Sequence, residues 1–84
     1  METRFDTTLG KSHLCYRVLR HTFGDREGYT ITVREECGGK ILRCELPDVT
    51  DEYDKARRIA AFLCQNAVSA VSVYDVWVER FCSP

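Results

Sequence analysis

No apolar run in this 84-residue sequence approaches the roughly 20 residues that a membrane-spanning helix requires. The first residues, Met1–Asp6, also lack the basic start and the apolar stretch of a secretory signal. Neither sign of charge is in excess, because 12 basic and 13 acidic residues leave a net charge of −1. Such a balance provides no overall attraction to nucleic acid or to an anionic membrane. We therefore expect a cytoplasmic protein without membrane contact, for which nucleic acid is a poor candidate partner.

Recognisable catalytic motifs are missing as well. The sequence has no phosphate-binding loop, no HExxH pattern and no nucleophile elbow. Its two histidines, His13 and His21, fall on one face of an expected strand, but too far apart to form a catalytic dyad. A cysteine nucleophile needs an accessible, electropositive setting with a positioned base, and only Cys15, near His13, approaches that description. We expect no enzymatic activity and no cofactor.

Five cysteines are many for this length, yet their number is odd and no Cys-x-x-Cys pair occurs. Cys44 and Cys64 fall on the expected apolar faces of a strand and a helix, where free thiols behave as small hydrophobic groups. A zinc site needs four ligands, and the best nucleus, His13-x-Cys15, has no convincing remainder. The spacing therefore favours free cysteines over a disulfide framework or a metal site.

The pair Gly38-Gly39 separates two segments of strict alternation, residues 29–37 and 40–46. Two central glycines suit a type I′ turn, which requires positive φ at both positions. This turn makes residues whose numbers sum to 77 face each other, and the apolar residues of both strands then share one face. The predicted pairs are Ile31 with Leu46, Val33 with Cys44, and Glu35 with Leu42.

A further strand is predicted over residues 12–23, before the turn-rich segment 24–28. A four-residue loop that pairs Phe23 with Gly28 makes facing residues sum to 51, which again gathers the apolar residues on one side. We expect Pro47, which has no backbone N–H to donate, to end the third strand. Residues 1–11 are expected to form a short strand or a loosely held arm.

These two registers place three arginines in one row on the other face of the sheet. Arg17 is predicted to lie opposite Arg34, and Arg34 opposite Arg43. Like charges that directly oppose each other are destabilising, so neighbouring glutamates must offset them. The row is either a solvated lattice of mixed charge or a face that binds an anion or a partner, because arginine binds carboxylate and phosphate in a bidentate manner.

A helix is predicted within residues 48–66, with Thr50 as the N-cap and Asn66 as a left-handed terminator. Apolar residues recur there at helical spacing and give one stripe. The tail, residues 68–81, is rich in β-branched and aromatic residues, which allows a fourth strand. The spacing Ser72-x-x-Asp75 resembles a capping box, and we favour a second short helix.

Together these elements predict one α+β domain over residues 1–84. Its fold class is a three-stranded antiparallel meander with two helices packed on one face, in the order β-β-β-α-α. The tail carries large apolar groups around most of its circumference, and these either complete the core or form an interface. Aromatic residues often anchor such contacts. The candidate interface residues are Tyr74, Trp77 and Phe81.

Four short motifs stand out along the chain: Tyr29 and Ile31, Asp48-Val49-Thr50, Val68-Ser69, and Asp75-Val76. They resemble those of a small family of uncharacterised proteins from Clostridia and related Firmicutes. The resemblance spans residues 16–81, with Ala70 at a position where the family usually has proline. It implies a closing helix and a bacterial, cytoplasmic context, and it supplies no catalytic residues.

The functional hypothesis from the sequence is a non-catalytic cytoplasmic interaction or regulatory protein. It either self-associates as a homodimer or binds another protein. The alternative hypothesis is an anion-binding or nucleic-acid-binding protein that uses Arg17, Arg34 and Arg43.

Overall fold

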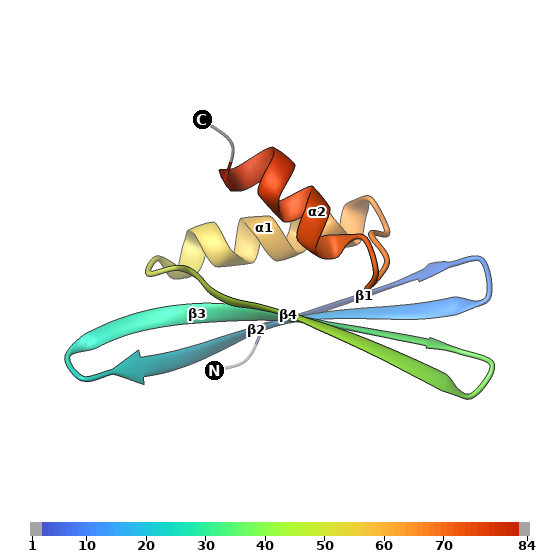
Figure 1. Cartoon of the computed structure of the whole chain (residues 1–84), viewed down its shortest axis with the longest axis horizontal. Coiled ribbons are helices and arrows are strands. Elements are labelled where there is room, and N and C mark those ends of the chain that lie inside the picture. Colours follow the sequence, from blue (N-terminus) through green and yellow to red (C-terminus); the bar gives the residue numbers. More distant parts are fainter. Residues whose placement is uncertain (1–2, 83–84) are drawn as a thin grey trace.

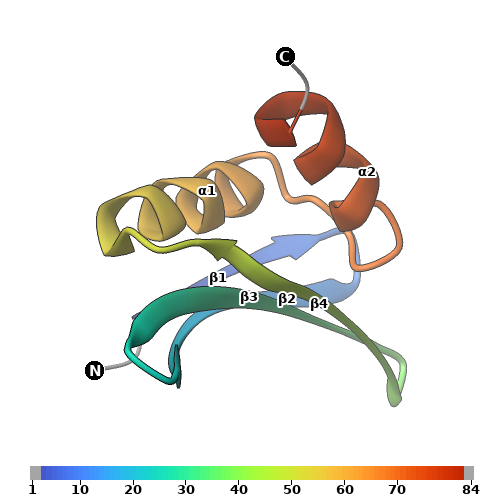
Figure 2. The same ribbon diagram turned by 60° about the vertical axis from the view of Figure 1, so that its left-hand side comes forward.

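Four antiparallel strands pair in the order in which they occur along the chain, and two helices and a short π-helix follow them (Figure 1). The computed structural model describes residues 3–82. All helical segments lie on one face of the sheet, which leaves the other face uncovered (Figure 2). The elements are β1 (Thr3–Leu9), β2 (Ser12–Phe23), β3 (Arg26–Cys37), β4 (Lys40–Thr50), α1 (Tyr53–Gln65), α2 (Val73–Trp77) and η1 (Val78–Cys82).

The prediction of a three-stranded sheet is wrong, because β1 forms a fourth strand. It pairs with β2 along its whole length, from Thr3 opposite Val18 to Leu9 opposite Ser12. Only Phe5 in the middle of β1 adds a large side chain to the core, where it lies opposite the buried Tyr16. Threonine, which favours strands, supplies three of the seven residues of β1. The expected arm of residues 1–11 is thus a strand from residue 3 onwards.

The hairpin between β3 and β4 confirms the predicted register. Gly38 and Gly39 have φ values of 57° and 82°, as a type I′ turn requires. Ile31 lies opposite Leu46 and Val33 lies opposite Cys44. Turn type and side-chain alternation therefore specify the same pairing.

The predicted register between β2 and β3 is wrong by two residues. The turn contains only Gly24 and Asp25, so Phe23 pairs with Arg26 rather than with Gly28. Gly24 has a φ of 63°, and a glycine at the first central position suits a type II′ turn. An error of two residues preserves the alternation of faces, so the apolar set still points to the core.

Pro47 does not end the strand, contrary to expectation. The register shifts between Tyr29 and Ile31, which lie opposite Thr50 and Leu46, respectively. Residues 47–49 therefore bulge out of β4, and proline is tolerated there because no ladder bond is required of it. Asp48 adopts a φ of 51° in this bulge.

Both predicted ends of the first helix shift. α1 begins at Tyr53 after the N-cap Glu52, and Thr50 instead belongs to β4, with its hydroxyl accepting a hydrogen bond from the N–H of Glu52 at 3.1 Å. At the other end Asn66 has a φ of −98°, and Ala67 is the left-handed residue, at 46°. The N–H groups of Ala67 and Val68 reach the carbonyls of Cys64 and Leu63 at 3.0 Å. These two bonds form a Schellman motif built on alanine.

The tail contains helices, as the favoured alternative predicted, and no strand within residues 68–82. The short α2 continues directly into η1. The capping box does not form, because the Ser72 side chain makes no cap bond; it contacts the Ser69 hydroxyl at 3.4 Å instead.

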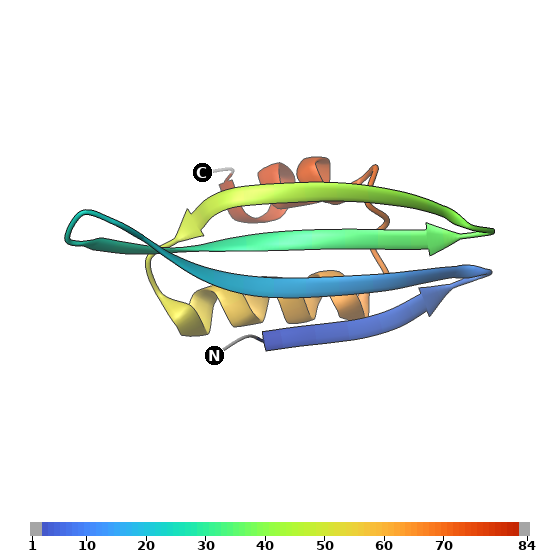
Figure 3. The same cartoon turned by 90° about the horizontal axis from the view of Figure 1, so that it is seen from below.

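The core lies between the sheet and the helices. Viewed from the uncovered side, α1 runs behind β1 and β2, whereas α2 lies behind β4 (Figure 3). Tyr16, at the centre, is fully buried and is the largest of the fully buried side chains. The buried cluster comprises Leu14, Tyr16, Val18, Ile31, Val33, Leu46, Ala56, Ile59, Ala60, Leu63, Val68, Ala70 and Val73.

Candidate functional site

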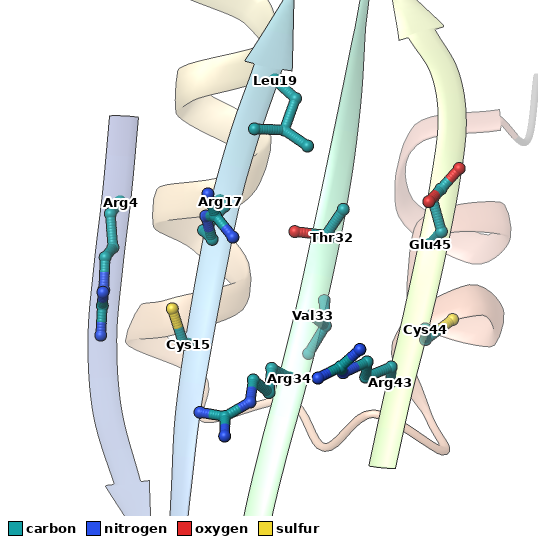
Figure 4. Close-up of a pocket in the computed structure, with 10 residues that line it drawn as sticks. All are labelled: Arg4, Cys15, Arg17, Leu19, Thr32, Val33, Arg34, Arg43, Cys44 and Glu45. Carbon is teal, nitrogen blue, oxygen red and sulfur yellow. The ribbon is translucent and has the colours of Figure 1, made fainter. Parts of the chain in front are cut away.

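We call the uncovered side of the sheet the outer face. Side chains alternate along each strand, so the residues between the buried ones point to this side. The outer face carries a hollow of about 630 Å³ above the middle of the sheet (Figure 4). Its lining is Arg4, Cys15, Arg17, Leu19, Thr32, Val33, Arg34, Arg43, Cys44 and Glu45.

Each of the four strands contributes one arginine to this hollow. Arg17, Arg34 and Arg43, the predicted residues, all line it, and Arg4 from β1 joins them. The sequence prediction does not include Arg4, because the pattern of residues 1–11 does not distinguish a short strand from a loosely held arm. With a single glutamate in the lining, the hollow has an excess of positive charge, although the whole chain has a net charge of −1.

The predicted row of opposed arginines is only half correct. Arg34 does lie opposite Arg43. Arg17, however, lies opposite Thr32 on one side and Arg4 on the other, because the β2–β3 register differs from the predicted one. The structure therefore has two pairs of opposed arginines, one on β1–β2 and one on β3–β4, in adjacent rows.

Arg4 and Arg34, which belong to different pairs, each bind a carboxylate on their own strand. Arg4 binds Asp6 at 2.9 Å, and Arg34 binds Glu36 at 2.9 Å. The Arg4 guanidinium holds the pKa of the Asp6 carboxyl below its usual range. All these side chains are substantially exposed, so each ion pair contributes little to stability.

Arg43 and Glu45 differ from these pairs. Within residues 3–82, neither side chain makes a hydrogen bond or an ion pair with another described residue. The Arg43 guanidinium extends towards β3, whereas the Glu45 carboxylate lies over β4 itself (Figure 4). β4 thus presents an unpaired charge of each sign on the outer face.

Cys15 lies in the outer-face row but is only 5% exposed. This burial raises the pKa of its thiol, which disfavours the thiolate that a nucleophile requires. His13 contacts the Asp6 carboxylate at 3.2 Å. All five cysteines are free, and no group of three His, Cys, Asp or Glu within residues 3–82 is arranged to hold a metal ion.

Gly28, on the outer face beyond the hollow, lies close to the side chains of Asp48 and His21. A Cβ atom at Gly28 would lie 2.5 Å from Asp48 Oδ1 and 2.7 Å from His21 Cε1. The Asp48 carboxylate also accepts a hydrogen bond from Arg26. A side chain at position 28 would therefore force Asp48 or His21 to move.

The three aromatic residues of the candidate interface do not form one exposed surface. Tyr74 is 58% exposed, and its ring centroid lies 6.1 Å from that of Trp77. Phe81 instead packs edge-on against Phe62 at 5.5 Å. Trp77 and Phe81 are both half-buried against the core, which leaves Tyr74 as the exposed member.

Comparisons with protein-family models, with curated proteins and with solved structures find no match to this chain. Within residues 3–82, none of the helices has the length and apolar character needed to span a membrane.

Proposed function

We propose that this protein is a non-catalytic interaction domain that binds an acidic segment of another protein on its outer face. The observation that carries this proposal is the hollow of about 630 Å³ to which every strand contributes one arginine. None of the helices within residues 3–82 covers this face (Figure 2).

The arginine pairs supply the chemistry of binding. A guanidinium presents five N–H donors in a planar fork that matches a carboxylate. Arg34 directly opposes Arg43, and such a pair repels. A carboxylate placed between the two guanidinium groups replaces that repulsion with charge-assisted hydrogen bonds.

The lining of the hollow favours a protein over a nucleic acid. Proteins that bind single strands usually stack bases on aromatic side chains. None of the ten residues lining the hollow is aromatic. The net charge of −1 also provides no general attraction to a polyanion. Nucleic-acid binding is therefore the second candidate.

We further propose that the protein works in the cytoplasm in a regulatory role. Its five free thiols support a reducing compartment. Burial of Cys15 supports a role other than thiol catalysis.

A binding titration with poly-L-glutamate, followed by fluorescence anisotropy, tests the proposal. We expect binding that weakens as salt is added. Arg34→Glu should weaken it at least about tenfold, because the substitution removes a cation and adds a like charge. Arg57→Glu is the matched control: it makes the same change on the exposed side of α1 and should leave affinity unaltered.

A parallel titration with a single-stranded oligonucleotide separates the two candidates. Tighter binding of the oligonucleotide, lost in Arg34→Glu, would replace the protein-binding proposal with nucleic-acid binding. Failure to bind poly-L-glutamate at low salt, or equal losses in Arg34→Glu and Arg57→Glu, would contradict the proposed site.

A further inference from the structure

β4 is an edge strand, and its free edge faces away from β3 along residues 40–46 (Figure 3). We infer that two copies of this chain associate through this edge, with the two β4 strands antiparallel and centred on Cys44. The result is one continuous sheet made from both copies. The inference goes beyond the proposed function, because it concerns another surface and another partner.

The backbone pattern of β4 allows this pairing. In a two-residue hairpin the residues that flank the turn exchange both hydrogen bonds, and the bonding direction then alternates along the strand. Cys37 and Lys40 flank the turn, so the even-numbered residues of β4 bond to β3. Ile41, Arg43 and Glu45 therefore direct their N–H and C=O groups to the free edge, where an antiparallel partner strand can accept and donate.

The charges select one register for the two strands. When the pairing is centred on Cys44, Arg43 of each copy lies opposite Glu45 of the other copy. The two residues then exchange both backbone bonds and bring opposite charges together on the outer face. These are the two charged side chains of the hollow for which residues 3–82 provide no partner.

In the two nearest registers, the odd-numbered residues of both strands still bond to each other, but the charges are less favourably placed. A shift one way places Arg43 opposite Arg43 of the second copy, and a shift the other way places Glu45 opposite Glu45. Both bring like charges together at the centre of the pairing, which is destabilising. The register centred on Cys44 is the one that opposes arginine and glutamate.

The apolar side chains of β4 agree with this register. Ile41 and Leu42 are 45% and 49% exposed, unusual values for neighbouring large apolar residues in one strand. On the helix-covered face, Leu42 of each copy comes to lie opposite Leu46 of the other. Pairing thus removes exposed apolar surface from water, which favours association.

The other edge strand is a weaker candidate. β1 also carries an arginine and an acid two residues apart, Arg4 and Asp6. These two already bind each other at 2.9 Å within one chain, and Asp6 also contacts His13. A second copy would have to displace those contacts, whereas Arg43 and Glu45 make no such contact with another residue of 3–82.

Pairing by β4 leaves the binding face available. A twofold axis perpendicular to the sheet keeps the helices of both copies on one side and joins the two outer faces on the other. Arg43 retains donors for an anion while it binds Glu45 of the second copy, because a guanidinium has five N–H groups. The dimer would therefore present two adjoining hollows to one partner.

Charge reversal tests the register, with sedimentation velocity as the measurement. Arg43→Glu and Glu45→Arg should each raise the dimer dissociation constant at least about tenfold, since each creates two like-charge pairs across the axis. The double variant R43E/E45R restores opposite charges in this register and should recover dimerisation. Tyr74→Ala, on the exposed side of α2, is the matched control and should dimerise normally.

Cross-linking supplies an independent test. Cys44 faces its own copy across the axis as a non-hydrogen-bonded pair, whose Cα atoms lie about 4.5 Å apart and suit a disulfide. Its sulfur lies on the side of β4 away from β3 (Figure 4). Mild oxidation with copper–phenanthroline and peptide mapping should show a Cys44–Cys44 link. Random collision would instead link the exposed Cys37 or Cys82.

Each contrary outcome is decisive. A monomer at all accessible concentrations, or a double variant no better than the single variants, would overturn the inference. So would a dimer lost in Tyr74→Ala, which would move the interface to α2. Binding of poly-L-glutamate is measured separately in Glu45→Arg, which keeps all four arginines of the hollow, so loss of the dimer with retained binding in this variant leaves the proposed function standing. Loss of binding with an intact dimer contradicts the proposed function alone.

Discussion

The phenol of Tyr16 donates a hydrogen bond to the backbone carbonyl of Val68 at 2.5 Å, across 52 positions of the sequence. Tyr16 is fully buried at the centre of β2, and Val68 follows the left-handed Ala67 that ends α1. The bond joins the sheet to the segment between the two helices. It therefore fixes where α1 ends relative to the core.

Tyr16→Phe should destabilise the fold by about 1–2 kcal/mol. The substitution keeps the ring in the core but leaves the Val68 carbonyl without its phenolic donor. Urea unfolding followed by circular dichroism measures the change. Tyr74→Phe, which alters an exposed hydroxyl, is the control and should stay within about 0.5 kcal/mol of the parent. Equal stability of Tyr16→Phe and the parent would show that the bond contributes nothing.

The same bond predicts a dependence on alkaline pH. Burial raises the pKa of Tyr16 above its usual value, so the folded state holds the phenolic proton more tightly than the unfolded state does. The resulting stabilisation is complete below the unfolded pKa of about 10 and declines as the pH rises above it. The stability difference between the parent and Tyr16→Phe should therefore shrink between pH ~9 and pH ~11. A difference independent of pH would contradict this assignment.

The sequence predicted the β3–β4 hairpin correctly because two independent signals agreed there. Gly38-Gly39 specified the turn, and the alternation of Ile31 and Val33 specified the face. At the β2–β3 turn, by contrast, Gly28 suggested a longer loop, although its real constraint is contact with His21 and Asp48. Such a long-range contact leaves no local signal.

The arginine face was predicted only in part, because it depends on the β2–β3 register. The register error of two residues kept Arg17 and Arg34 on the predicted face but changed their opposite neighbours. Arg4 was missed because β1 has only Phe5 and Leu9 as large apolar residues. A strand held mainly by its ladder with β2 has a weak sequence pattern.

The helix ends show a further limit of local reasoning. Asn66 is the residue type that favours a left-handed C-terminus, yet Ala67 adopts that conformation. The following Val68 is buried and held by Tyr16. Tertiary contacts thus place the end of α1 one residue later than side-chain preference predicts.

Ala67→Gly should stabilise the protein by about 0.5–1 kcal/mol. Alanine at positive φ carries a steric cost of roughly 1–2 kcal/mol, which exceeds the entropy that glycine adds to the unfolded chain. Thermal unfolding measures the gain. Ala61→Gly, within α1, is the matched control and should lose about 1 kcal/mol. Destabilisation by both substitutions would contradict the strain assigned to Ala67.

Gly28→Ala should destabilise the fold by about 1–3 kcal/mol, because the added methyl group overlaps two neighbouring side chains. The nearest atoms would be Asp48 Oδ1 and His21 Cε1, at 2.5 and 2.7 Å. A double-mutant cycle with His21→Ala measures the contact. We expect the loss to be smaller in the His21→Ala background, by at least about 0.5 kcal/mol. Additive losses would show that His21 can move aside freely.

Glu35 makes the second bond from the sheet to the segment between the helices. Its carboxylate accepts a hydrogen bond from the N–H of Ala70 at 3.0 Å, on the helix-covered face. Ala70 is 6% exposed, so removing the acceptor leaves a buried donor with poor access to water. Glu35→Ala should therefore lower stability by about 1–3 kcal/mol.

Hydrogen exchange locates that loss. The Ala70 amide should exchange faster in Glu35→Ala, because its N–H group loses its acceptor. The exchange rates of amides at the centre of β3 should rise only as far as the lower free energy of unfolding requires. Glu35→Gln keeps an oxygen acceptor at the same position and should retain most of the protection. If Glu35→Gln lost as much as Glu35→Ala, the negative charge rather than the hydrogen bond would hold the segment. The role of Glu35 would then be electrostatic, and the protection of Ala70 should fall as salt is added.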